Sequence, residues 1–196
     1  MNSITLYEDK LCLVSCQNER LKTQLLELNQ THSATICTPA TCGENPKGED
    51  GIIFPLETEF SIAIRTADCT PIYYQGEKEA ALVHAGWRGI QSLIHLDEKI
   101  KAVNPHTIIT GPSICDNCFE VSEDFHQEFP ESKEYFKNQK NKQTFSIKSL
   151  VQDQLNEHFP DANLKMSTEC TLCQSHWHSY RRNKTTKRNF TIFQKR

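Results

Sequence analysis

The fold is decided by the stretch Glu79-Ala80-Ala81-Leu82-Val83, which runs directly into His84-Ala85-Gly86-Trp87-Arg88-Gly89. The first five residues form an apolar run of strand length, and the apolar spacing that begins at Ile90 predicts a helix over residues 90–103. A strand that leads at once into a helix is typical of α/β folds, in which ligands bind at the carboxyl ends of strands. Gly86 and Gly89 allow a sharp turn and a close backbone approach there. His84 is therefore a candidate site residue.

The same alternation of short apolar runs and helical patterns continues along the chain. Further helices are predicted over residues 123–129, after Ser122, and over residues 147–159, after Ser146. Strands are predicted over residues 34–38, 60–64, 72–74, 80–83, 107–110 and 189–193. We expect one α/β or α+β layered domain covering residues 1–196, with a mixed β-sheet packed between helices.

Composition excludes several classes of function. The net charge of −3 over 196 residues, with the signs interspersed, argues against nucleic acid or an anionic membrane as partner. Charges at residues 8–10 interrupt the apolar core that a signal peptide needs, and no apolar run reaches membrane-spanning length. We therefore expect a cytoplasmic protein. Its nine cysteines, an odd number, then indicate thiols and metal ligands more than a disulfide framework.

Two further segments carry chemistry. Arg65-Thr66-Ala67-Asp68-Cys69-Thr70-Pro71 follows a predicted strand, and Gln30-Thr31-His32-Ser33 precedes one. Together with His84–Gly89 they resemble the YfiH-like family, also called the laccase-domain or polyphenol oxidoreductase family, which includes purine nucleoside phosphorylases. The resemblance spans residues 18–193 and continues in Asp50-Gly51, Gly111-Pro112-Ser113-Ile114, Phe119-Glu120-Val121, Glu169-Cys170-Thr171 and Ser179-Tyr180-Arg181-Arg182.

The resemblance implies a zinc ion bound by His32, Cys69 and His84. No metal-binding spacing rule selects these three residues, and alone Cys69 would be a core thiol and His32 a loop histidine. Imidazole and thiolate suit Zn²⁺, with copper as an alternative occupant. Three protein ligands leave a fourth tetrahedral position open to water or substrate, as in catalytic zinc sites.

For function, the resemblance implies phosphorolysis of adenosine, inosine, guanosine and methylthioadenosine, with adenosine deamination as a further activity. Arg88 and Arg65 are candidate catalytic residues, because a guanidinium matches phosphate oxygens bidentately. Asp68 and Glu120 are the candidate carboxylates for proton transfer in deamination. Arg65, Asp68 and Arg88 could equally form a structural ion pair between two loops. The expected partners are a purine nucleoside and phosphate, in a monomer or a small homo-oligomer.

The candidate substrate-binding residues include aromatic and basic side chains. Trp87 could stack on a purine base or simply pack beside the strand end. Of Arg181 and Arg182, one is expected to be structural and the other to face the pocket. The wider basic cluster is either a solvated surface or an anion site; it comprises Arg181, Arg182, Lys184, Lys187 and Arg188.

Two other enzyme classes are alternatives to the zinc enzyme. Cys69 as nucleophile with His84 as base would make a thiol hydrolase or amidase, in keeping with a link between the family and quality control of cell-wall precursors. A copper-dependent polyphenol oxidase needs many histidines in repeated His-x-His pairs, whereas this chain has eight histidines and one such pair, His176-Trp177-His178.

A third alternative rests on two C-x-x-C pairs, Cys115-Asp116-Asn117-Cys118 and Cys170-Thr171-Leu172-Cys173. They could close a four-thiolate structural zinc site, form a redox-sensitive pair or be incidental thiols. Residues 119–169 separate the pairs, far more than the roughly 15–20 residues of a zinc ribbon. A redox or zinc-structural interaction protein built on these pairs is therefore a further hypothesis.

Overall fold

The computed structural model describes residues 1–139 and 142–196, and its strands form three sheets. The largest sheet is mixed, because its two outer pairs, β13 with β9 and β4 with β5, are parallel and the pairs between them antiparallel. In spatial order its six strands are β13 (Asn163–Lys165), β9 (Thr107–Thr110), β7 (Thr70–Gln75), β8 (Glu79–Ala85), β5 (Gly51–Pro55) and β4 (Ile36–Cys37).

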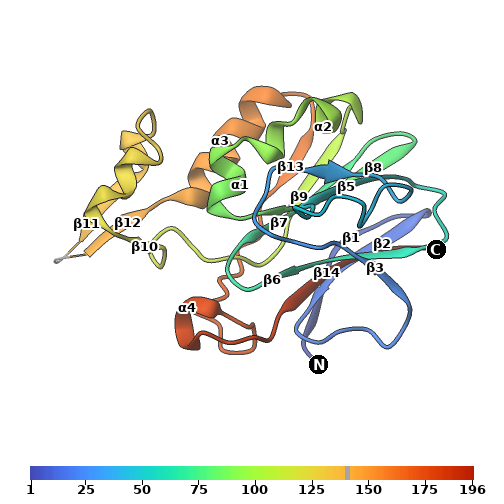
Figure 1. Ribbon diagram of the computed structural model, residues 1–196, viewed down its shortest axis with the longest axis horizontal. Helices are drawn as coiled ribbons and strands as arrows, with labels where there is room; N and C mark the ends of the chain where they lie inside the picture. Colours follow the sequence, from blue (N-terminus) through green and yellow to red (C-terminus); the bar gives the residue numbers. More distant parts are fainter. Residues whose placement is uncertain (140–141) are drawn as a thin grey trace.

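Helices cover one face of this sheet (Figure 1). They are α1 (Trp87–Gln91), the 3₁₀ turn η1 (Ile94–Leu96), α2 (Glu98–Ala102) and α3 (Ile147–His158). The prediction of α3 is confirmed, but one continuous helix over 90–103 is wrong. Leu93 adopts a left-handed conformation with φ 57°, and the Asp97 side chain accepts a hydrogen bond from the Lys99 amide, which starts a new helix.

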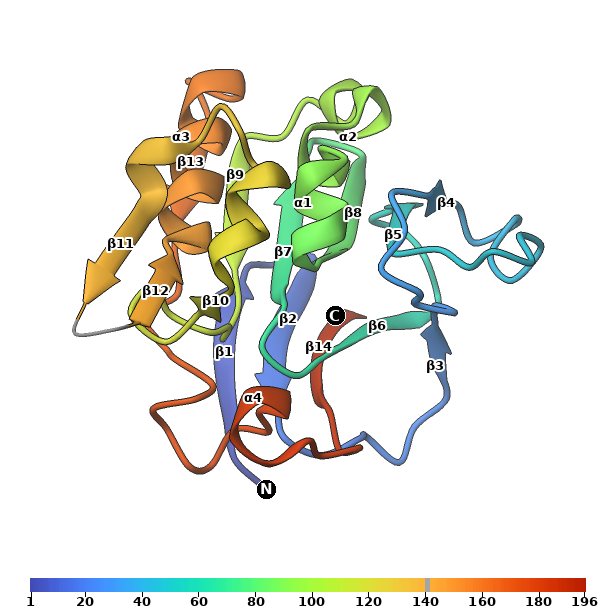
Figure 2. The ribbon, with the colours of Figure 1, turned by 60° about the vertical axis from the view of Figure 1, so that its left-hand side comes forward.

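A second sheet covers the opposite face, so the prediction of a sheet packed between helices is wrong. Figures 1 and 2 show this sheet below the six-stranded one. Buried apolar side chains cover both faces of β7 and β8. Ile72 and Val83 face the helices, whereas Tyr73 and Leu82 face the second sheet. In spatial order, the five strands of the second sheet are β1 (Ser3–Glu8), β2 (Cys12–Gln17), β14 (Asn189–Lys195), β6 (Ser61–Thr66) and β3 (Leu25–Glu27).

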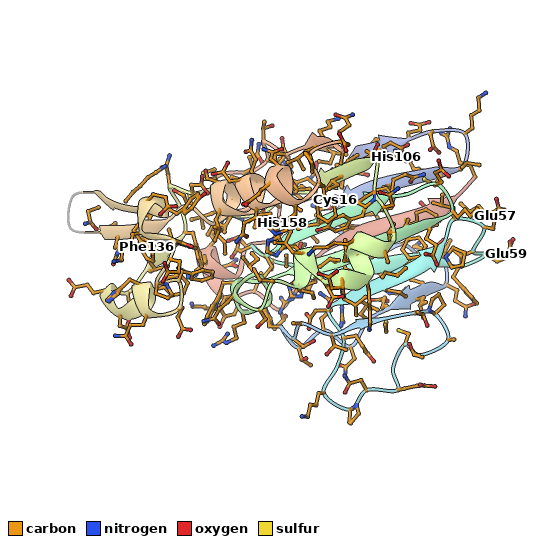
Figure 3. The ribbon with its side chains drawn as sticks, turned by 90° about the horizontal axis from the view of Figure 1, so that it is seen from above. Cys16, Glu57, Glu59, His106, Phe136 and His158 are labelled. Carbon is orange, nitrogen blue, oxygen red and sulfur yellow. The ribbon has the colours of Figure 1, made fainter. Side chains whose placement is uncertain are left out.

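The third sheet projects from one end of the molecule. Its strands are β10 (Glu120–Val121), β12 (Lys142–Phe145) and β11 (Phe136–Gln139). Two 3₁₀ turns precede β11, namely η2 (Glu123–Gln127) and η3 (Lys133–Tyr135), so the helix predicted over 123–129 is a short 3₁₀ turn. Figure 3 shows Phe136 of β11 at the opposite end of the molecule from Glu57 and Glu59.

The chain reaches its last strand through a loop that carries the short helix α4 (Tyr180–Asn183). The Ser179 hydroxyl accepts a hydrogen bond from the Arg182 amide and so caps the start of this helix. In Figure 1, α4 lies below β10 and beside β6. None of the helices in the described part of the chain is long and apolar enough to cross a lipid bilayer.

Candidate functional site

Strand pairing brings three residues from distant segments together. His84 lies near the end of β8, and its register partner on β7 is Pro71. Cys69 immediately precedes β7, so the antiparallel pairing places it beside the end of β8, and His32 reaches the same point from the loop between β3 and β4. One nitrogen of each histidine and the Cys69 sulfur all lie within 4.8 Å of one another. The Cys69 Sγ is 3.7 Å from His32 Nε2, and the two imidazole rings meet edge to face.

Asp50, immediately before β5, orients both histidines. Its Oδ1 lies 2.6 Å from Nδ1 of His84, and its carboxylate also accepts backbone N–H groups from Thr31, His32 and Ser33. Asp50 is fully buried, so these hydrogen bonds are shielded from water. Because Nδ1 of His84 donates to Asp50, Nε2 is left free to bind a metal, the arrangement found behind many metal-binding histidines.

The approach of His32 depends on two backbone features. His32 itself has a left-handed backbone with φ 62°, held by the hydrogen bond from its amide to Asp50. Opposite it, Gly86 has no side chain, and a Cβ there would lie 2.7 Å from His32 Cδ2 and 3.3 Å from Cys69 Sγ. Gly86 is therefore required for the close approach of His32 and Cys69 to this turn.

The site polarises the Cys69 thiol. Burial alone would raise its pKa, but the charge of His84 and the hydrogen bond from His32 lower the pKa of Cys69 to about 6. Burial alone would lower the pKa of His84, whereas the Cys69 thiolate and Asp50 raise it to about 9. Both shifts favour a Cys69 thiolate beside a His84 imidazolium, and the thiolate is the form of cysteine that binds metals and attacks electrophiles.

A cavity of about 610 Å³ opens beside the three residues. This volume lies within the range of sites for small organic ligands, roughly 300–1,000 Å³. Aromatic rings from three segments line the cavity, namely Trp87, Phe119 and Tyr180. Four arginines line it as well: Arg65, Arg88, Arg181 and Arg188. The cavity thus combines apolar ring surfaces with guanidinium groups beside a cluster of potential metal ligands.

Arg88 and Arg65 reach the cavity in different ways. The Arg88 guanidinium lies 4.2 Å from the centre of the Trp87 ring, which itself packs edge-on against Phe125. Arg65 donates to the Leu28 carbonyl and lies 3.8 Å from a carboxylate oxygen of Glu27. Arg65 is therefore partly engaged in a structural contact, whereas Arg88 is exposed to the cavity.

The adjacent Arg181 and Arg182 have different surroundings. The Arg182 guanidinium donates to the backbone carbonyls of Trp177, Thr171, Leu172 and Gln174, and it does not line the cavity. Arg181 lines the cavity, where its guanidinium stacks over Phe119 and donates to the backbone carbonyl of Glu120.

The two candidate carboxylates also have different surroundings. Asp68 lines the cavity with a left-handed backbone of φ 96°. Its two oxygens accept hydrogen bonds from the Thr171 hydroxyl and the Arg181 amide, both at 2.7 Å. The Glu120 side chain lies outside the cavity lining and forms an ion pair with Lys142.

Several residues of the site, among them Asp50 and Arg188, had no role assigned from the sequence. In the sequence, Asp50 stands out only as part of the Asp50-Gly51 pair, and no motif marks a single carboxylate as a partner of a histidine. Arg188 belonged to the basic cluster near the carboxyl end, but only the tertiary structure brings it to the cavity.

The comparisons with known proteins agree with this architecture. The family model described as multi-copper polyphenol oxidoreductase laccase matches residues 12–194. The chain belongs to this family. The resemblance to laccase-domain proteins inferred from the sequence motifs is therefore confirmed.

Relatives of this laccase-domain chain include named enzymes. It is 32% identical over 151 residues to a purine nucleoside phosphorylase of Aquifex aeolicus, covering 74% of this chain and 70% of that protein. It is 33% identical over 91 residues to adenosine deaminase RL5 of an unknown prokaryotic organism, covering 42% of this chain and 34% of that one. A crystal structure of a Neisseria meningitidis protein of family DUF152 matches its fold with a TM-score of 0.79 at 20% identity, covering 98% of both chains.

The donor atoms of this laccase-domain chain do not fit the multicopper centre in the family description. Within residues 1–139 and 142–196, His, Cys and carboxylate groups gather in two clusters, one of them all cysteine and the other with two histidines. His176 and His178, the one His-x-His pair, contact Glu169 and the Asn18 carbonyl instead. A trinuclear copper centre needs many more imidazoles, whereas two imidazoles and a thiolate fit a single zinc ion.

Proposed function

We propose that this laccase-domain chain is a zinc-dependent purine nucleoside phosphorylase, with His32, Cys69 and His84 as the zinc ligands. The observation that carries the proposal is the convergence of these three donor atoms within 4.8 Å beside an arginine-lined cavity. A purine nucleoside phosphorylase among its relatives supports the same reaction. When bound, zinc would supply a Lewis acid that polarises a substrate oxygen.

The arginines of the cavity would hold phosphate, the nucleophile of the reaction. Phosphorolysis transfers the ribose anomeric carbon from the purine nitrogen to a phosphate oxygen, and the electron pair of the broken carbon–nitrogen bond leaves with the base. Arg88 is the best placed of the four, because its guanidinium is exposed to the cavity and matches phosphate oxygens bidentately. Arg181 and Arg188 also line the cavity and would complete the anion site.

The aromatic residues of the cavity would bind the base. Trp87, Phe119 and Tyr180 offer ring surfaces on which a planar purine can stack. Asp68 would act as a positioning residue, because both of its oxygens accept hydrogen bonds and one of them holds the Arg181 backbone. Its carboxylate is also the candidate for moving a proton in adenosine deamination, the activity named for one relative.

Product analysis tests this proposal. Purified protein is incubated with adenosine, inosine or methylthioadenosine, with and without phosphate, and the products are identified by mass spectrometry. Phosphorolysis predicts free purine and a pentose 1-phosphate only when phosphate is present. Inosine formed from adenosine without phosphate would indicate deamination, and turnover of neither kind would contradict the proposal.

One observation favours a second candidate function, a thiol hydrolase or amidase. The Cys69 sulfur lies within 4.8 Å of a ring nitrogen of His84, and the pKa of Cys69 is lowered by this imidazole, as in the Cys–His pairs that activate cysteine nucleophiles. The two functions respond differently to metal removal. A thiol hydrolase keeps its activity in a chelator and loses it on alkylation of Cys69, whereas the zinc enzyme loses activity in the chelator and regains it when zinc is restored.

A further inference from the structure

The two C-x-x-C pairs, far apart in the sequence, meet in the fold. The four sulfur atoms of Cys115, Cys118, Cys170 and Cys173 all lie within 4.8 Å of one another, and Cys118 Sγ is 3.4 Å from Cys173 Sγ. All four are free thiols. A tetrahedral zinc ion with Zn–S bonds of about 2.3 Å holds its sulfurs about 3.8 Å apart. We propose that these four cysteines bind a second, structural zinc ion, distinct from the site at His32, Cys69 and His84.

The backbone holds the two pairs in place before any metal is considered. Ser113, two residues before the first pair, forms a parallel bridge with Cys170, and its carbonyl accepts the Thr171 amide at 3.1 Å. Each pair closes a tight turn, since the Cys118 amide donates to the Cys115 carbonyl and the Gln174 amide donates to that of Cys170. The separation of the pairs by residues 119–169 argued against a shared zinc site. The tertiary structure removes this argument, because it brings the two pairs together.

Backbone amides also point at one of the sulfurs. The amides of Cys115 and Cys173 donate to Cys170 Sγ at 3.3 and 3.5 Å. Hydrogen bonds from N–H groups stabilise a thiolate relative to a thiol, and the thiolate is the form that binds metal. Each of the two amides belongs to another cysteine of the cluster, so the four residues form one connected unit.

A half-buried positive charge, the ammonium of Lys148, lies beside the cluster. The Lys148 ammonium donates to the carbonyls of Ser167 and Glu169, the second of which directly precedes Cys170. Four thiolates around Zn²⁺ carry a net charge of −2, so a neighbouring ammonium would partly offset it. Asp116, inside the first pair, accepts hydrogen bonds from the Lys148 amide and the Ser149 hydroxyl, which fixes that pair to the start of α3.

The second site would stabilise one wall of the cavity. Ile114 and Phe119, which flank the first pair, both line the cavity. Thr171, inside the second pair, donates to Asp68, the neighbour of Cys69. Zinc held by both pairs would therefore tie these segments together. This inference does not depend on the proposed nucleoside chemistry.

The decisive experiment uses a chain that lacks the first site. The variant His32→Ala/Cys69→Ser/His84→Ala is purified without a metal-binding tag or chelator. We expect about one zinc ion per chain, with X-ray absorption showing four sulfur neighbours at about 2.3 Å. A zinc-free, folded variant would overturn the proposal, as would a zinc shell of nitrogen and oxygen.

A second variant tests the ligands themselves. Cys118→Ser/Cys173→Ser should lower the zinc content of the wild-type chain by one ion and lower its melting temperature, because structural zinc contributes directly to folding free energy. Cys42→Ser, at a half-buried thiol outside both metal-ligand clusters, is the matched control and should retain the full zinc content. Unchanged zinc in the double variant would refute the assignment; if that variant does not fold, the absorption spectrum of the first variant decides.

Thiol counting distinguishes zinc from a redox pair. Alkylation of the freshly purified, denatured chain under anaerobic conditions, in the presence of a chelator, should label all four cysteines. A disulfide between Cys118 and Cys173 in that sample would contradict a tetrathiolate zinc site.

Discussion

Asp50 Oδ1 lies 2.6 Å from Nδ1 of His84, and the same buried carboxylate accepts the backbone amide of His32. One side chain therefore orients two of the three proposed zinc ligands. This carboxylate–imidazole contact fixes the His84 tautomer, so that its other nitrogen is free for the proposed zinc ion.

Replacing Asp50 tests this dependence. Asp50→Asn should weaken zinc binding at the first site by about 10- to 100-fold, the usual effect of losing such a partner. Competition with a chromophoric chelator measures the affinity. Glu49→Gln is the matched control, because Glu49 is a buried carboxylate on the same loop that contacts the amides of Gly43 and Asn45 instead of a histidine. Equal zinc affinities in the two variants would show that Asp50 does not support the site.

Arg88→Lys tests the phosphate role. A lysine keeps the charge but loses the planar fork, so we expect kcat/KM for phosphate to fall at least tenfold, about 1.4 kcal/mol. Steady-state kinetics with phosphate as the varied substrate measures this. Arg196→Lys is the control, because Arg196 pairs with Glu8 and lies outside the cavity lining. This substitution should leave kcat/KM for phosphate unchanged. An unaltered kcat/KM in Arg88→Lys would remove Arg88 from the phosphate site.

Arg181 and Arg182 should separate activity from stability. Arg182→Ala removes the side-chain donor from four backbone carbonyls, two of them in partly buried hydrogen bonds, so we expect a loss of about 1–3 kcal/mol in unfolding free energy. Arg181→Ala should unfold almost like the wild type but show a higher KM for phosphate or nucleoside. Urea unfolding and steady-state kinetics on both variants check this, and the reverse pattern would refute the assignment.

His95 should make the stability depend on pH. Its ring is fully buried against Gln154, and burial lowers its pKa to about 4. Below the unfolded-state pKa of about 6.5, the unfolded chain binds a proton that the folded chain does not, so stability falls as the pH drops from 6.5 to 4. The loss should reach about 3 kcal/mol, since one pKa unit corresponds to about 1.4 kcal/mol.

Urea unfolding at pH 7 and pH 4.5 measures the effect. The variant His95→Gln keeps a donor toward Gln154 but cannot take up a proton, so its stability should fall less between the two pH values. An equal loss of unfolding free energy in wild type and variant between the two pH values would mean that His95 does not cause the pH dependence of stability.

Sequence patterns predicted six strands and α3, but not the second layer. The prediction missed β2 because two of its buried residues, Ser15 and Gln17, are polar and do not show the apolar run expected of a core strand. It also failed over residues 90–103, because apolar spacing persists there while Leu93 turns left-handed and interrupts the helix. The spacing of apolar residues indicates which side chains are buried, but it does not indicate where the backbone leaves the helical conformation.

Predictions for the candidate site depended on family resemblance more than on spacing. His32, Cys69 and His84 come from three segments; the β7–β8 register brings Cys69 to His84, and the hydrogen bond from the His32 amide to Asp50 brings in the third. The two C-x-x-C pairs could be read directly, but their convergence requires the bridge between Ser113 and Cys170. Such long-range pairings are set by the whole fold and leave no local pattern.

The central claim concerns one metal position, and anomalous X-ray diffraction at the zinc edge tests it most directly. Crystals of the wild-type chain should show an anomalous peak bonded to Cys69 Sγ and to one nitrogen each of His32 and His84, at about 2.0–2.3 Å. That peak should vanish in His84→Ala crystals. Wild-type crystals grown with zinc that show no peak among these three residues would contradict the account.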